Sequence, residues 1–476
     1  MVRFGMVVFA VLLAVGPCFA ATASKPSGVE LTIYNQNFAL VKETRDMTLE
    51  EGINFVSVED VAASIERSSV HFKSLTDPNS VVVREQNYQY DVINPRTILD
   101  KSVGKRIKVR RFVDGSVHEQ QGVLLSTADN GVVLQTATGV ILNPGGEMEV
   151  SELPGGLVSR PTLVWKLEAS KGGGHRTEIS YLANQINWIA DYVAVVDPVD
   201  KYVDLTGWVT LDNRSGATYE NATLNLMAGD VHRVQEPEAP RARGAMLDMA
   251  YAGAEPQFAE KAFFEYHLYT LKEKTTVKDK ETKQITLMTA ARVPAKKLYI
   301  YDGRQTWWGM WRYRTDYRPG ESYDVSANKK INVLVEIMNS KENNLGIPLP
   351  KGKVRVYKQE ADANQHFVGE DMIDHTPKDE KVRLYLGDAF DVVGEHTRMN
   401  FRRISSREVE ESFEISLRNH KDAPVTVVAV EHLVSDWKII ESSHKYFKKD
   451  ASTVEIPVEV PKDGEVKITY TVRTKW

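Results

Sequence analysis

The chain has 476 residues, with 60 Lys and Arg against 65 Asp and Glu, which gives a formal net charge of −5. This mildly acidic balance argues against nucleic acid or anionic lipid as the principal partner. A single cysteine excludes an intramolecular disulfide, and the length favours about three domains, each large enough to bury a core.

The first residues predict a signal peptide, which we place at residues 1–23. Arg3 supplies a positive charge, the apolar run Phe4–Val15 follows, and small residues end the segment. A membrane-spanning helix needs about 20 apolar residues, so this run is too short to be one. We expect cleavage after Ala20 or Ala23.

Cys18 lies inside this predicted signal, so the mature protein has no thiolate nucleophile and no Cys-ligated metal. Pro17 directly precedes it, whereas lipidation signals have a small residue there, so a lipoprotein is disfavoured. No later stretch is long and apolar enough to predict a transmembrane helix. The expected location is therefore the periplasm or the cell surface.

The first third of the mature protein predicts two β-rich segments. Residues 27–91 alternate apolar and polar positions between Asn, Gly and Pro turns, which is typical of a small β domain. Residues 92–152 begin with a short candidate helix at Thr97–Val103 and then resemble a small Sm-like β-barrel in pattern. Four of its expected strands are Arg106–Phe112, Gln121–Ser126, Gly131–Gln135 and Gly139–Leu142. Because the segment has only one tight basic pair, a scaffold role is favoured over RNA binding.

Residues 160–395 predict a central β-sandwich with one long interruption. The segment 235–261 is rich in Pro, Ala, Gly and charge and has no period, so we expect a disordered insertion there. Residues 398–476 contain several short alternating strands with regular turns, which predicts an immunoglobulin-like C-terminal sandwich. The whole sequence is thus predicted to be all-β and multidomain.

Several spaced stretches of the second half resemble one exported bacterial family, the domain of unknown function 4139. They are YLANQINWIADY, LTGWVTLDNRSGATYENATLNLMAGDV, FFEYHLYTLKEKTTVKDKETKQITLM, KVRVYK and GEDMIDHTPKDE. Mucoidy-inhibitor-like proteins share this domain, and the resemblance covers roughly residues 162–476. It implies a β-rich envelope protein and carries no established activity or catalytic residue.

The stretch 349–391 concentrates acidic and histidine side chains between two regular strands. Asp371, Asp374 and His375 are close in sequence, and His366 could approach from the preceding turn, which gives a candidate divalent-metal site. Successive strand residues point to opposite faces, so these groups converge only in an irregular loop. The alternative is a charged hairpin in which Asp371 or Asp374 caps backbone amides. A metal-dependent hydrolase centred on this loop is the rival to a binding protein.

An aromatic cluster provides the second candidate site. Trp307, Trp308, Trp311 and Tyr313 could contact a glycan, because an aromatic face stacks on the apolar face of a sugar ring. Aromatic residues also form cores and subunit interfaces, and that interpretation is favoured.

Two further patterns are weaker. Ser69 with His71 and Ser443 with His444 place hydroxyls beside imidazoles, but neither pair has the orienting acid of a catalytic triad. The last strand ends on Trp476 as outer-membrane strands do, yet the sequence lacks repeated spans of about 9–11 residues. We therefore expect an exported envelope protein that binds or assembles with a protein or surface glycan. No cofactor is expected for that role, and outer-membrane association is the third hypothesis.

Overall fold

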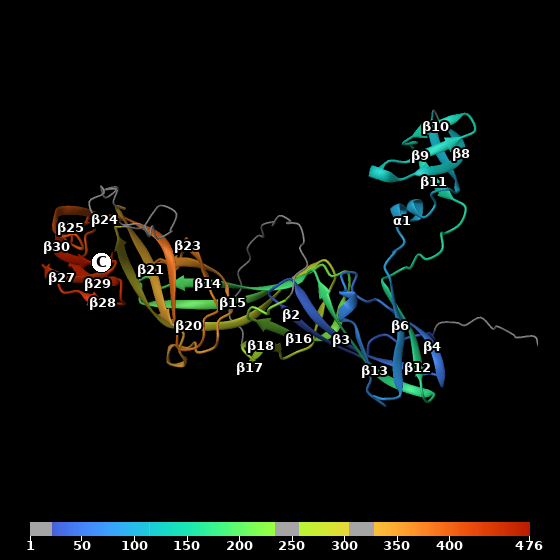
Figure 1. Cartoon of the computed structure of the whole chain (residues 1–476), viewed down its shortest axis with the longest axis horizontal. Coiled ribbons are helices and arrows are strands. Elements are labelled where there is room, and N and C mark those ends of the chain that lie inside the picture. The colour runs from blue at the N-terminus through green and yellow to red at the C-terminus, as the bar shows by residue number, and fades with distance from the viewer. Residues whose placement is uncertain (1–20, 114, 234–256, 304–327) are drawn as a thin grey trace, which may run out of the picture. The chain divides into compact units, whose positions relative to one another are not determined.

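The computed structural model describes residues 21–113, 115–233, 257–303 and 328–476, and these residues are almost entirely β-structure (Figure 1). The prediction of an all-β protein built from several sheets is confirmed. These described residues fall into two compact units: unit 1 draws on those within 21–188, 211–227 and 270–283, and unit 2 on those within 189–210, 228–269 and 284–476. No helix within these described ranges is long and apolar enough to cross a membrane.

Unit 1 is built on two sheets whose strands alternate buried and exposed positions. The first sheet has the order β1 (Ala21–Thr22), β4 (Gly52–Glu59), β12 (Thr162–Ala169) and β6 (Val81–Gln89). The second contains β16 (Tyr219–Ala228), β2 (Gly28–Tyr34), β3 (Phe38–Leu49), β13 (Gly173–Asn184) and β5 (His71–Ser74), with β19 (Thr275–Val277) on β16. Their inward residues include fully buried Trp165 and Tyr181, which supply large apolar area to the core.

The segment 92–152 forms a five-stranded sheet of its own, with α1 (Pro95–Asp100) before it (Figure 1). Asn94 caps α1 by accepting from the Thr97 N–H, and Pro95 occupies the first turn, where its missing N–H is harmless. The strand order is β10 (Gly139–Leu142), β9 (Val133–Thr136), β8 (Ser116–Ser126), β7 (Arg106–Val113) and β11 (Glu147–Val150). Its small core contains Ile107, Val109, Leu124, Val132 and Leu134. The predicted helix and the four predicted strands are present, although β8 begins at Ser116 rather than Gln121 and α1 ends at Asp100 rather than Val103. The five strands form an open sheet, so the predicted small barrel is not closed.

The predicted boundaries at 91 and 160 do not separate compact units. β12 pairs antiparallel with both β4 and β6, and β13 pairs with β3 along twelve residues. Strands on either side of the insert therefore share the same two sheets. The reason is that a strand buries its apolar face only when its neighbours are present, wherever in the sequence they lie.

Unit 2 is organised around one large sheet. Its main path is β23 (Gln365–Ile373), β22 (Gly352–Gln359), β14 (Ile186–Val196), β15 (Tyr202–Asn213), β20 (Glu281–Asp302), β21 (Lys330–Met338), β24 (Lys381–Ser405), β25 (Glu408–Asn419), β30 (Gly464–Lys475) and β27 (Asp436–Ser442). Beside this path, β26 (Val425–His432) pairs with β20 and β29 (Thr453–Val460), and β28 (Phe447–Lys448) pairs with β29. Two more strands, β17 (Phe258–Phe263) and β18 (Tyr266–Leu271), belong largely to unit 2, and three short 3₁₀ turns occur at Arg67–Ser69, Ala128–Asn130 and Lys341–Asn343.

The C-terminal strands, drawn in orange to red in Figure 1, enclose one apolar core. Inward residues of β24, β25, β27 and β30 meet those of β20, β26 and β29, among them Phe413, Ile456 and Ile468. The predicted boundary between 395 and 398 falls inside β24, which is continuous from Lys381 to Ser405. A single long strand thus serves both the central and the C-terminal parts of unit 2.

The predicted disordered insertion 235–261 lies mostly outside the described residues. Its last residues are described, and they begin β17 at Phe258. The prediction of disorder is therefore wrong for residues 258–261, which belong to β17. Phe258 is buried, and burying this aromatic ring is the gain in free energy that a composition-based argument overlooked.

Candidate functional site

His366 and Asp371 lie on β23, which pairs antiparallel with β22, and Asp374 and His375 follow it. The alternation predicted β22, whereas residues 365–373 were expected to form a turn and a charged loop, so that part of the prediction is wrong. Asp371 accepts hydrogen bonds from the backbone N–H groups of Tyr385, at 2.7 Å, and Met372, at 2.8 Å. Asp374 accepts from the His375 N–H at 2.8 Å. Each carboxylate therefore satisfies backbone amides, which is the capping role of the alternative interpretation.

The two histidines of the predicted metal site lie in different surroundings. His375 Nδ1 accepts from the Lys351 N–H at 3.2 Å, whereas the exposed His366, near the start of β23, pairs with Glu360 at 3.3 Å. Burial lowers the pKa of His375, although Asp230 and Asp374 act in the opposite direction. A neutral imidazole agrees with this geometry, because Nδ1 accepts a hydrogen bond and therefore carries no proton of its own.

The four predicted ligands are thus not gathered around one point. Within residues 21–113, 115–233, 257–303 and 328–476, no group of three or more His, Cys, Asp or Glu side chains could hold a metal ion. The predicted aromatic site, formed by Trp307, Trp308, Trp311 and Tyr313, lies outside the described residues.

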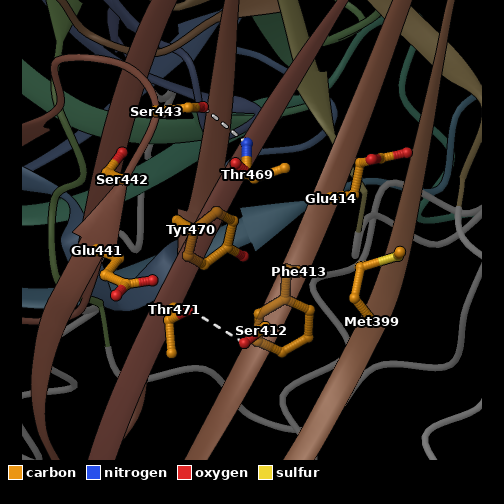
Figure 2. Close-up of a pocket in the computed structure, with 10 residues that line it drawn as sticks. All are labelled: Met399, Ser412, Phe413, Glu414, Glu441, Ser442, Ser443, Thr469, Tyr470 and Thr471. Atoms are coloured by element: carbon orange, nitrogen blue, oxygen red, sulfur yellow. Dashed lines mark hydrogen bonds between the residues drawn. The ribbon is translucent and has the colours of Figure 1, made fainter.

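A different site is present on the outer face of the C-terminal sheet, where four neighbouring strands form a hollow of about 480 Å³ (Figure 2). The strands are β24, β25, β30 and β27, in that order. The hollow is lined by Met399, Ser412, Phe413, Glu414, Glu441, Ser442, Ser443, Thr469, Tyr470 and Thr471. We call it the C-terminal hollow.

Short side chains in the middle of the sheet produce this hollow. On the outer face, Ser412 of β25 stands beside Thr471 of β30, and their hydroxyl oxygens are 3.0 Å apart (Figure 2). The next cross-strand pair is Glu414 with Thr469. Phe413 and Tyr470 alternate with these residues and point into the core, so they form only the floor.

Long charged side chains border the hollow at both ends. At one end Glu410 is hydrogen-bonded by Arg402 and Arg473, which lower the pKa of Glu410. At the other end Lys467 donates to Glu414 at 3.1 Å, and this hydrogen bond raises the pKa of Lys467. These ion pairs fix the long side chains over the sheet and leave the hydroxyl-lined centre open.

Two β-bulges shape the sides of the hollow. The register of β24 with β25 shifts between Arg398 and Asn400, which leaves Met399 unpaired and 61% exposed. The register of β27 with β30 shifts between Ile439 and Glu441. A bulge increases the local twist and redirects the adjacent side chains, so both flanking strands curve around the same hydroxyl groups.

Ser443 lines this hollow, and the sequence analysis considered it with His444 as a hydroxyl beside an imidazole. Its Oγ accepts from the Thr469 N–H at 2.8 Å (Figure 2). The same oxygen lies 2.8 Å from His444 Nδ1. The hydroxyl therefore fastens the end of β27 to β30. The other pair is not formed: Ser69 Oγ donates to the Glu66 carbonyl and accepts from the Leu182 N–H.

The hollow offers five Ser and Thr hydroxyl groups, two carboxylates and one exposed thioether, and no Lys or Arg lines it. Such a surface can exchange hydrogen bonds with a ligand rich in hydroxyl, amide or ammonium groups. Sequence reasoning missed these residues, although Ser412, Glu414, Thr469 and Thr471 occupy the polar positions of two strands that were predicted. No family model and no curated protein matches the sequence.

Proposed function

We propose that this protein is an exported cell-envelope protein that binds a partner without converting it chemically, and that the C-terminal hollow is its binding site. Export is supported by Arg3, the apolar run Phe4–Val15 and the small residues after it. An envelope role is supported by the resemblance to the domain of unknown function 4139. The proposed partner is another envelope protein or a surface glycan.

The observation that carries this proposal is the hydroxyl-lined centre between two charged borders. Because the border side chains are held in ion pairs, a ligand meets preformed groups and loses little free energy in ordering them. Hydroxyl and carboxylate oxygens suit a partner that presents several donors, as a glycan or a peptide backbone does.

Binding is favoured over catalysis by how the reactive side chains are used. Ser443 accepts a backbone N–H, and Asp371, Asp374 and His375 do the same in the acidic loop. A catalytic group needs its proton-accepting atom directed at the substrate. The acceptor atoms of Asp371, Asp374 and His375 are instead directed at the main chain, and Ser443 Oγ divides its contacts between the Thr469 N–H and His444 Nδ1.

The test compares the mature protein with two tryptophan variants. Thr469→Trp places a large ring in the hollow, while Thr426→Trp changes another exposed threonine, on β26 and outside the hollow. Each protein is passed over immobilised cell-wall glycan strands and, separately, over purified envelope proteins. We expect the unchanged protein and Thr426→Trp to be retained on one of the two supports and Thr469→Trp to lose most of its retention. Equal retention of all three proteins would reject the hollow as the binding site.

A further inference from the structure

One edge of the small sheet formed by segment 92–152 has unpaired backbone groups. β10 is the last strand in the order of that sheet, and among the described residues it pairs only with β9. The Asn143 N–H, just after β10, donates to the Val132 carbonyl at 2.7 Å, so it points toward β9. Inward and outward backbone groups alternate along an antiparallel strand. Ile141 therefore also points toward β9, while the N–H and C=O groups of Val140 and Leu142 point away from it.

The same two residues carry exposed apolar side chains. Val140 is 57% exposed and Leu142 is 70% exposed. Both side chains lie on the face of the sheet opposite its core, because Ile141 between them is paired with the buried core residue Leu134. We call this the outer face of the small sheet. Val133, which stands opposite Leu142, extends the apolar surface onto β9.

The charged residues of the outer face gather on the other half of the sheet. Lys108 and Arg110 of β7 form ion pairs with Glu149 of β11, at 3.4 Å and 2.7 Å, and Arg110 also pairs with Glu119 of β8. The opposite edge strand, β11, thus carries both Glu147 and Glu149, and charges on an edge strand oppose its pairing with another chain. β10 has no charged residue, no proline and no bulge in its register with β9.

We infer that β10 is the surface through which two copies of this protein associate, by pairing antiparallel with β10 of the second copy. The edge is complementary to its own reverse, because Val140 and Leu142 flank Ile141. A two-fold axis at Ile141 places Val140 of each copy opposite Leu142 of the other, where the two residues exchange backbone N–H···O bonds. Their apolar side chains then meet as cross-strand neighbours on the outer face.

The distribution of charge favours a second copy as the partner. In this pairing the uncharged half of each outer face lies at the two-fold axis and the ion pairs of β7 and β11 lie away from it, so no like charges are brought together. An edge of four residues buries less than the roughly 1,200 Å² of a stable interface, so the dimer is weak and depends on concentration. The C-terminal hollow and its ligand play no part in this inference.

Sedimentation velocity of the mature protein, from low micromolar to near-millimolar concentration, measures the association. We expect the fraction of dimer to rise with concentration. Leu142→Lys places a charge on the pairing line and should weaken dimerisation about tenfold or more, because an unpaired charge is costly to bury. The control Val117→Lys adds the same charge to the outer face on β8, at a residue that is 54% exposed and lies away from β10. It should dimerise as the unchanged protein does.

An introduced cysteine traps the contact even when association is weak. The natural Cys18 lies in the predicted signal peptide, so a new thiol is unique in the mature protein. In Ile141→Cys the two thiols face each other at the two-fold axis, where the Cα atoms of such a pair are about 4.5 Å apart and a disulfide can form. Glu147→Cys, on the exposed edge of β11, is the control for random collision. We expect several times more disulfide-linked dimer from Ile141→Cys.

Hydrogen exchange of residues 139–142 distinguishes a second copy from other occupants of this edge. We expect fast exchange in dilute protein and slower exchange as the concentration rises. Protection in the dilute monomer would show that another part of the same chain covers β10, and would overturn the inference. So would a protein that stays monomeric at every concentration, equal dimerisation of Leu142→Lys and Val117→Lys, or equal cross-linking of the two cysteine variants. The melting temperature of each variant verifies that it is folded.

Discussion

The Arg45 guanidinium lies 2.7 Å from the Glu43 carboxylate, and the two side chains are only 3% and 5% exposed. Arg45 also donates to the carbonyl oxygens of Ser24 and Glu59, and Tyr181 donates to Glu43. Two charges are thus removed from water but remain hydrogen-bonded. The pair ties the residues just after the predicted signal peptide to the core of unit 1.

Arg45→Met should lower the free energy of unfolding by about 3–5 kcal/mol, because it leaves the Glu43 carboxylate buried without its counter-charge. Urea denaturation followed by tryptophan fluorescence measures the change. Arg160→Met removes the exposed pair with Asp60 and should cost at most about 1 kcal/mol. Similar costs for both variants would contradict the assigned role of the buried pair.

The unfolding of the native protein should depend on pH through His375. The folded-state pKa of His375 lies below its ordinary value because burial disfavours the charged ring. The unfolded state therefore binds the proton more readily, and stability is lost as the pH falls from the unfolded value of about 6.5 through the folded pKa. His375→Asn should lose less stability than the unchanged protein between pH 7 and pH 5. Parallel melting curves for the two proteins would reject this.

Gly394→Ala should destabilise the C-terminal sandwich. An added Cβ would lie 2.2 Å from the ring of Tyr301, which is fully buried. Overpacking of this kind costs typically about 1–3 kcal/mol, and more where the neighbour cannot move. Gly145→Ala, whose Cβ would meet no atom within 4 Å, is the matched control and should leave the melting temperature nearly unchanged. Equal melting temperatures for the two variants would show that Tyr301 can move aside.

The acidic loop should behave as a structural hairpin. Asp374→Ala should cost up to about 2 kcal/mol, because its carboxylate accepts the His375 N–H, and a chelator should leave the melting temperature unchanged. Differential scanning fluorimetry and elemental analysis of purified protein check both points. A near-stoichiometric divalent ion that disappears in Asp374→Ala would restore the hydrolase hypothesis.

The mature N-terminus should be Ala21 rather than Ser24. Starting at Ala21 retains β1, whose two residues pair with Val56 and Ser57 of β4, and the following Ala23 N–H, which donates to the Ser57 carbonyl. Intact-mass spectrometry of the exported protein identifies the first residue. A retained Met1 or a lipid on Cys18 would refute export through a cleaved signal.

The sequence predicted the structure best where the pattern within one strand is enough to identify that strand. Alternation along Val354–Tyr357 and Val466–Val472 predicted strands that the structure contains, since burial of one face acts at every second residue. The C-terminal hollow was not predictable, because Ser412 and Thr471 become neighbours only through the pairing of β25 with β30. The bulge at Met399 has no signature within its own strand, since it depends on the register of the partner.

The position of the insert between β6 and β12 affects how unit 1 folds. Gln89 pairs with Thr162, and Val92 bridges Val158, so the backbone leaves and re-enters the sheet at adjacent points. Once the small sheet of β7–β11 has formed, the remaining loop between β6 and β12 is effectively as short as that of a hairpin. The entropy cost of closing this long segment is then offset inside the segment itself, because its five strands bury their own small core. Early folding of the small sheet of β7–β11 would bring β6 and β12 together before the rest of their own sheet assembles.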